Sequence, residues 1–146
     1  MELRSSAVIE RPIEQVWRFF LDWDNVPKWD THPRRVWTQQ TAGPMAVGTT
    51  ILATEQIGPF RVRLPVKVVE FEPYRMIGFQ VGGPFKASVT RFSFERVGTA
   101  TRVIKSARAR GLLKLVMSPI MPILQRKYEA YMPNAKRALE AAITTT

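Results

Sequence analysis

The sequence has no cysteine and a single histidine, His32. Without cysteine there is no disulfide framework, no thiolate nucleophile and no zinc site with thiolate ligands. A single histidine excludes the paired-histidine zinc motifs, and no nucleophile-elbow sequence places a serine for a Ser-His-Asp triad. We therefore expect no metal and no cofactor, and the residues alone define no complete catalytic set.

Long hydrophobic runs are also missing. The apolar stretch from Leu115 to Leu124 contains Pro119 and Pro122 and is far shorter than the roughly 20 residues that span a bilayer. The first residues carry charges, at Glu2 and Arg4 among others, where a signal peptide is apolar. We therefore expect a soluble, cytoplasmic protein.

Acidic residues are few relative to basic ones. The chain has 12 Asp and Glu against 22 Lys and Arg, a formal charge of +10 that favours anionic partners. Nucleic-acid-binding proteins usually concentrate Lys and Arg on one element, with aromatic residues between them, whereas here the basic residues are spread along the chain. We interpret the charge as a solvated surface and expect no nucleic-acid partner; a basic patch formed only in three dimensions is the alternative.

The 146 residues, 45% of them apolar, suit one domain over 1–146 with one core. Leu3–Glu10 predicts a first strand, the apolar spacing from Ile13 to Leu21 predicts a short helix, and a second helical turn ends near Trp29. Alternating patterns between glycine and proline turns predict further strands at 34–39, 49–57, 60–72, 74–81, 85–97 and 99–110. Hairpin-length connections between them imply an antiparallel meander.

From Leu112 onward the apolar residues recur at helical spacing, which predicts a long C-terminal helix. Pro133 removes an internal hydrogen bond and crowds the carbonyl of Glu129, so we expect a kink just before it. The predicted fold class is α+β: a curved antiparallel sheet of about seven strands, two short helices after the first strand, and the long helix packed on the concave face.

Short motifs run in a characteristic order along nearly the whole chain: Ala7-Val8-Ile9-Glu10-Arg11-Pro12-Ile13 into Val16-Trp17, Asp22-Trp23 to Trp29, Val47-Gly48-Thr49, Phe71-Glu72-Pro73, Phe94-Glu95-Arg96 with Gly98-Thr99, and Ala135 to Glu140. In these motifs the chain resembles the START-like (SRPBCC) superfamily with its helix-grip fold, in particular the polyketide cyclase/dehydrase and lipid-transport branch. The resemblance implies a hydrophobic cavity between the sheet and the last helix, and it implies no single chemistry.

The residues that we expect to line this cavity are aromatic, or apolar and flexible: Trp29, Phe92, Phe94, Met117, Met121, Leu124, Tyr128, Tyr131 and Met132. Tyr128 and Tyr131 are the expected polar contacts, because a buried hydroxyl needs a partner such as a ligand carbonyl. Ordinary core packing is the alternative for the same set.

The expected function is the binding or carriage of a small hydrophobic molecule, lipid-like or polyketide-like, by a monomer or homodimer. A cyclase or dehydratase is the alternative, with Glu55, Tyr128 or His32 as proton-transfer groups if they project into the cavity; otherwise His32 is a loop residue. A third hypothesis is that the protein binds an anionic polymer or a membrane surface. Leu112–Lys127 would contact the membrane transiently.

Overall fold

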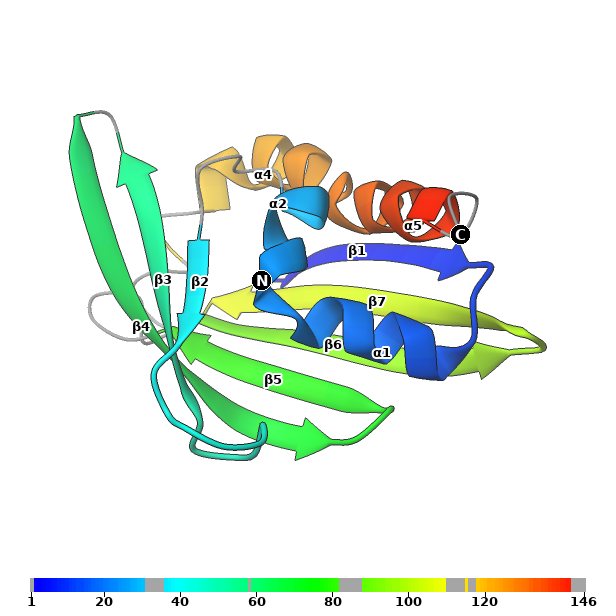
Figure 1. Cartoon of the computed structure of the whole chain (residues 1–146). Coiled ribbons are helices and arrows are strands. Elements are labelled where there is room, and N and C mark those ends of the chain that lie inside the picture. The colour runs from blue at the N-terminus through cyan, green and yellow to red at the C-terminus, as the bar shows by residue number, and fades with distance from the viewer. Residues whose placement is uncertain are drawn as a thin grey trace.

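Seven antiparallel strands form the sheet, in the order β1-β7-β6-β5-β4-β3-β2 (Figure 1). The computed structural model describes residues 2–30, 36–57, 59–81, 88–109, 115 and 118–142. The strands are β1 (Glu2–Ile9), β2 (Val36–Gln39), β3 (Thr50–Ile57), β4 (Phe60–Glu72), β5 (Met76–Val81), β6 (Ser88–Val97) and β7 (Ala100–Ala109). The helices are α1 (Ile13–Leu21), α2 (Val26–Trp29), α4 (Met121–Tyr128) and α5 (Tyr131–Ala142), with 3₁₀ turns η1 (Trp23–Asn25) and η3 (Ser118–Ile120).

The predicted α+β fold with an antiparallel meander is confirmed. The predicted strand at 60–72 has the bounds of β4, and the strand predicted at 49–57 begins one residue early. Parts of three predicted strands, at 34–35, 85–87 and 110, lie outside the described residues. The period-two patterns located the strands because each one buries a single face.

The sheet is strongly curved, which gives it a concave inner face. The register between β4 and β5 shifts between Val68 and Glu70, and a bulge of this kind bends a strand and increases its twist. In Figure 1 the β3–β4 hairpin rises beside the helices while β5, β6 and β7 lie beneath them. The inner face therefore partly surrounds whatever the helices place against it.

Helix α1 closes one end of this inner face with an apolar stripe. Its buried residues are Ile13, Val16, Trp17 and Phe20, which recur at the spacing of one helical face. The Trp17 ring meets the Phe94 ring edge-on, with the ring centroids 5.1 Å apart. The amphipathic helix predicted in this segment is confirmed, and its aromatic rings form that end of the core.

The C-terminal helix consists of two segments, α4 and α5, that meet at Glu129 and Ala130. The kink predicted just before Pro133 is confirmed at this junction, and the start predicted at Leu112 lies outside the described residues. Ser5 of β1 satisfies backbone groups at the junction: its Oγ accepts from the Met132 amide at 3.1 Å and donates to the Glu129 carbonyl at 3.0 Å.

The same helices cover the outer edge of β1, which is an edge strand of the sheet. The Gln125 side chain accepts from the Arg4 amide at 3.1 Å and donates to the Arg4 carbonyl at 2.9 Å, as a neighbouring strand would. The Lys136 ammonium donates to the Val8 carbonyl at 2.7 Å. An uncovered edge is a template for unwanted pairing, and here side chains of α4 and α5 occupy it.

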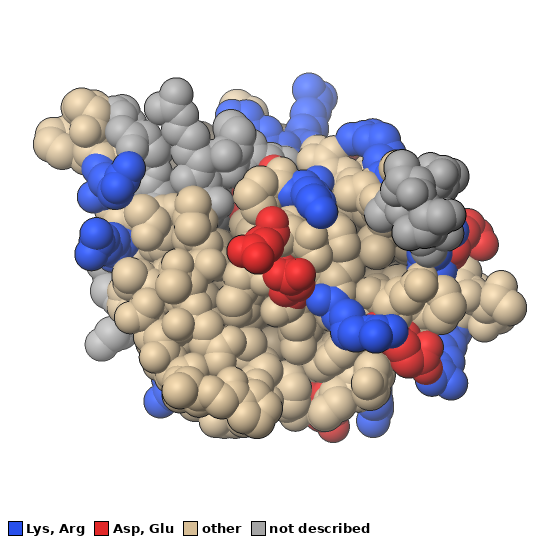
Figure 2. Space-filling model, in the orientation of Figure 1, with Lys and Arg blue, Asp and Glu red and all other residues tan. Residues whose placement is uncertain are grey.

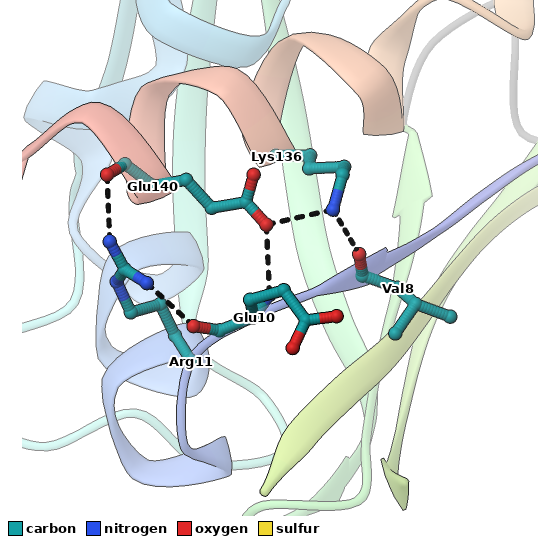
Figure 3. A network of polar contacts seen from close by, with 5 residues as sticks. All are labelled: Val8, Glu10, Arg11, Lys136 and Glu140. Atoms are coloured by element: carbon teal, nitrogen blue, oxygen red, sulfur yellow. Dashed lines mark hydrogen bonds and ion pairs between the residues drawn. The ribbon is translucent and has the colours of Figure 1, made fainter.

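Glu140 completes the attachment of α5 to β1 (Figure 3). One of its carboxylate oxygens accepts from the Lys136 ammonium at 2.7 Å and from the Glu10 amide at 3.0 Å. Arg11 donates to the Glu140 backbone carbonyl at 2.7 Å. The hydrogen bond from Lys136, followed by that from the Glu10 amide, lowers the pKa of the Glu140 carboxyl below its ordinary value of 4.5.

The surface charge is dispersed on the face in view in Figure 2. Lys and Arg lie there in separate small groups, both at the margins and toward the middle, where they neighbour Asp and Glu, and the lower middle of the face is largely uncharged. Ion pairs on the described surface include Arg91 with Glu70 and Arg102 with Glu95. No helix among the described residues has the length and apolar character needed to cross a membrane.

We predict that Glu140→Gln lowers the free energy of unfolding at pH 7 by about 1 kcal/mol, because the amide keeps the shape but loses the charge-assisted bonds of a partly exposed group. A carboxyl whose pKa is lower in the folded state contributes stability above its unfolded pKa and loses it as the pH falls through the folded pKa. Urea unfolding should therefore show the difference at pH 7 and a smaller one at pH 3.

Glu95→Gln is the matched control, because its pair with Arg102 is more exposed and spans 3.2 Å. We expect a smaller change from it. Equal losses in the two variants, or a loss from Glu140→Gln that does not depend on pH, would contradict the role assigned to Glu140.

We also predict that Ser5→Ala costs about 1–3 kcal/mol of folding free energy, because it leaves buried backbone groups at the α4–α5 junction without their partner. Ser6→Ala is the control, since Ser6 is the exposed neighbour on the same strand, and a surface change of this kind stays within about 0.5 kcal/mol. Thermal and urea unfolding measure both. A Ser5 variant as stable as the Ser6 variant would show that the junction does not depend on this hydroxyl.

Candidate functional site

A cavity of about 130 Å³ lies on the inner face of the sheet, next to α2 and β2. Its walls are mostly apolar and aromatic, and two of the described lining side chains, Thr90 and Lys105, are polar. The lining residues are Trp29, Trp37, Ala53, Leu64, Val66, Phe79, Val81, Thr90, Phe92 and Lys105. A mostly apolar hollow with a few placed polar groups is the usual form of a small-molecule site.

Strand register explains why these side chains meet. Trp37 pairs with Ala53, and Ala53 pairs with Leu64, which sets one row across β2, β3 and β4. A second row crosses β5, β6 and β7, where Ile77 pairs with Phe92 and Phe92 with Lys105. Because side chains alternate between the faces of a sheet, every member of a row points to the same side.

Lys105 is the charged side chain among the described residues that line the cavity. It is only 7% exposed, and its ammonium donates to the Tyr128 hydroxyl at 2.8 Å. The ammonium also lies 4.1 Å from the centre of the Tyr128 ring and 4.2 Å from that of Tyr131. Each desolvated cation–π contact of this kind contributes on the order of 2 kcal/mol, which offsets part of the cost of burying the charge.

The two tyrosines come from the junction between α4 and α5. Tyr128 ends α4 and Tyr131 begins α5, and their ring centroids are 5.0 Å apart. Burial, with a smaller contribution from Tyr131, raises the pKa of the Tyr128 hydroxyl well above its ordinary value. Tyr128 therefore keeps its proton at physiological pH and can donate it while its oxygen accepts from Lys105.

The lining also contains indole N–H groups that lack an acceptor. Trp29 Nε1 and Trp37 Nε1 are buried and have no hydrogen-bond partner within the described parts of the chain. Buried donors are normally paired. Together with the Lys105 ammonium, these two indole N–H groups make hydrogen-bond donors the main polar groups of the described cavity walls.

The structure brings together four of the nine residues predicted to bind a ligand. Trp29 and Phe92 line the cavity, and Tyr128 and Tyr131 enclose the ammonium of Lys105. Phe94 packs on Trp17 and Phe20 instead. Of the other predicted residues that the structure describes, Met132 is fully buried in the core, and Met121 and Leu124 are half-buried on α4. These three lie apart from the described cavity walls. Met117 lies outside the described residues.

Two of the three proton-transfer candidates are also outside the described part of the structure. His32 is not described, and neither is the side chain of Glu55 or of its neighbour Gln56. Tyr128, the third candidate, is buried and hydrogen-bonded to Lys105. The sequence prediction of a partner for the Tyr128 hydroxyl did not foresee that the partner is a lysine of the chain itself.

Sequence reasoning missed Lys105, although a signal was present. In β7 the residues Thr101, Val103 and Lys105 share one face by their period-two spacing, and the first two are fully buried. A lysine that continues an inward-facing series is unusual, because lysine is almost never fully buried without a partner. This spacing is the signal in the sequence that would have identified Lys105 as a functional candidate.

Larger hollows lie on the outer face of the sheet. One of about 700 Å³ is lined by charged side chains, where Arg91 pairs with Glu70 and Arg108 with Glu2. Another of about 580 Å³ lies over the outer face of β2, β3 and β4, beside Arg61 and Arg63. They are exposed and polar, so the inner cavity is the better candidate for an apolar ligand despite its smaller volume.

The described residues contain no group of three or more His, Asp or Glu side chains arranged to hold a metal ion. The polar groups of the described cavity walls are instead the Lys105 ammonium, the Thr90 hydroxyl and the indole N–H groups of Trp29 and Trp37. This set can donate hydrogen bonds to oxygen atoms and stabilise negative charge.

Comparison with solved structures places the fold among known proteins. A crystal structure of TTHA0849 from Thermus thermophilus matches with a TM-score of 0.72 and 16% identity, over 97% of this chain and 99% of that one. The Aha1 dimer from Colwellia psychrerythraea matches with a TM-score of 0.69 and 19% identity, over 96% of both chains. The AHSA1-like protein from Aeromonas hydrophila matches with a TM-score of 0.65 and 19% identity, over 97% and 94%.

At these identities the likeness shows the fold alone. A search of curated proteins finds no significant match. The family described as polyketide cyclase / dehydrase and lipid transport matches residues 1–140, in agreement with the resemblance seen in the sequence motifs. The chain therefore belongs to the polyketide cyclase / dehydrase and lipid transport family.

Proposed function

We propose that the protein binds a small apolar molecule in the inner cavity and does so without changing it chemically. The observation that carries the proposal is the cavity itself, which has aromatic walls and lies on the inner, concave face of the sheet. The family description, which names both cyclization or dehydration and lipid transport, supports a ligand-binding role and leaves the chemistry open.

The volume sets the size of the ligand. A cavity of about 130 Å³ is close to the roughly 150 Å³ of an engineered apolar cavity that takes up benzene in another protein. We therefore propose a molecule, or the terminal group of a larger one, with the bulk of a single ring. Rings of Trp29, Phe79 and Phe92 around the cavity would stack on it.

A cyclase or dehydratase is the second candidate, and the Lys105–Tyr128 pair favours it. The Lys105 ammonium forms part of the cavity wall and is held by the Tyr128 hydroxyl, so it can stabilise the negative charge that develops on the oxygen of a carbonyl substrate. This candidate needs turnover of a bound carbonyl compound, and replacing Lys105 with Met would abolish that turnover while leaving binding of unreactive apolar ligands in place.

Transient membrane contact, as expected from the sequence, stays a prediction. The side chains of Ile120 and Ile123 are exposed on η3 and α4, and Arg126 and Lys127 follow them. A homodimer likewise stays a prediction; among the matched structures, the Colwellia protein is described as a dimer.

We predict that toluene and benzyl alcohol raise the melting temperature in a concentration-dependent way, because a ligand that binds only the folded state stabilises it. The stabilisation should reach about 2.7 kcal/mol at about 100 times the dissociation constant. Differential scanning fluorimetry and calorimetric titration provide the measurements. Absence of any response to ring-sized ligands would refute the proposal.

The control pair for this experiment lies on β3. Ala53 lines the cavity, whereas its neighbour Thr54 faces the outer hollow. Ala53→Leu should weaken toluene binding by about tenfold or more, because the larger side chain takes up cavity volume that the toluene ring would occupy. Thr54→Leu should leave binding unchanged. Equal affinities in both variants would place the ligand elsewhere.

A further inference from the structure

Three buried indole N–H groups lie close together beside the inner face of the sheet. Trp23, Trp29 and Trp37 each have a buried Nε1 atom with no hydrogen-bond partner in the described structure. The ring centroids of Trp23 and Trp37 lie 5.4 Å apart, and those of Trp29 and Trp37 lie 6.3 Å apart. A buried donor without an acceptor is rare in folded proteins and costs free energy, so a group of three needs a physical explanation.

Two of these three side chains border the inner cavity. Trp29 on α2 and Trp37 on β2 are among its lining residues, whereas Trp23 on η1 is not. The Nε1 atoms of Trp29 and Trp37 are closed off from solvent. An acceptor that does not belong to the described chain would therefore have to reach them from the cavity.

We propose that the cavity takes a neutral, ring-sized molecule with an acceptor oxygen, such as a cyclic or aromatic ketone, and that the indole N–H groups of Trp29 and Trp37 donate to this oxygen. The inference rests on the proposed binding function and adds the chemical class of the ligand. A carbonyl oxygen has two lone pairs and can accept from both donors. The ring of the ligand would lie against the apolar part of the wall, at Val66, Phe79 and Phe92.

The neutral character of the ligand follows from the donors. Indole N–H groups carry no net charge, so they can satisfy a carbonyl oxygen but cannot offset the desolvation of a full negative charge. The charged group among the described lining residues, the Lys105 ammonium, is already bound by the Tyr128 hydroxyl and enclosed by the rings of Tyr128 and Tyr131. The ligand oxygen is therefore assigned to the tryptophans, and Lys105 keeps its own partners.

The test compares two rings of nearly equal shape, cyclohexanone and methylenecyclohexane, by calorimetric titration of the whole chain. They differ in an oxygen atom that replaces a CH₂ group. A cavity that offers the ketone no hydrogen bond would bind it about 100-fold more weakly than the hydrocarbon, because the carbonyl loses its hydration. We expect the ketone to bind within about tenfold of the hydrocarbon, because the two indole groups replace that hydration.

Nuclear magnetic resonance spectra identify the donors. Cyclohexanone should move the indole N–H proton signals of Trp29 and Trp37 downfield, because a hydrogen bond deshields the proton, and methylenecyclohexane should move them less. Neither ligand has an aromatic ring that would shift these signals by itself. The Trp23 N–H is also buried without a partner in the described structure but lies outside the described cavity lining, so its signal is the internal control and should stay in place.

Trp37→Phe removes one donor and keeps an aromatic side chain in the wall. It should weaken cyclohexanone binding by about threefold to tenfold more than methylenecyclohexane binding, the range of one neutral hydrogen bond. Trp23→Phe is the matched control, because it removes a buried indole outside the described lining, and it should leave the ratio of the two affinities as in the wild type. If Trp37→Phe does not fold, the wild-type ratio and the indole signals decide.

The outcomes separate this proposal from the one on which it rests. Methylenecyclohexane binding with cyclohexanone weaker by more than about tenfold, or indole signals that respond alike to both ligands, would overturn the role of the tryptophans and leave the proposed function standing. An equal loss of ketone affinity in Trp23→Phe and Trp37→Phe would also overturn that role. No binding of either ring would overturn both proposals.

Discussion

The contact of the Lys105 ammonium with Tyr128 and Tyr131 is the interaction on which the rest of the structure depends. A buried cation requires compensation, and the tyrosines that provide it stand on either side of the junction between α4 and α5. The break in the C-terminal helix therefore has a consequence in the core: two rings from different segments face the same ammonium. In an unbroken helix Tyr128 and Tyr131 would keep a fixed angular offset about the helix axis, so their two rings could not take independent positions around the ammonium.

That junction is held by the neighbouring strand. Ser5 satisfies backbone groups where the helix breaks, and it is paired in register with Lys105 on β7. Ser5, which bonds to the junction, and Lys105, which the tyrosines of the junction cover, are thus neighbours in one row across the sheet. Along the same edge, Gln125, Lys136 and Glu140 bond to the backbone at the edge of β1, so the position of the helices relative to the cavity is set over the length of the strand.

The fold was predictable from the sequence because local patterns determine it: period-two strands such as 60–72, the apolar face of α1, and the break before Pro133. The candidate site was predictable only in part. Trp29 and Phe92 were found as aromatic residues, whereas Phe94 belongs to the core around Trp17. Lys105 was missed because a charge count treats lysine as a surface residue, and its place on the buried face of β7 depends on which face of the sheet the helices cover.

The binding of a ring-sized molecule on the inner face of the sheet is tested most directly by a crystal structure of the protein with toluene. We predict that the toluene ring lies in the inner cavity, against the rings of Trp37, Phe79 and Phe92. Toluene bound only on the outer face, with the inner cavity closed by side chains, would contradict this.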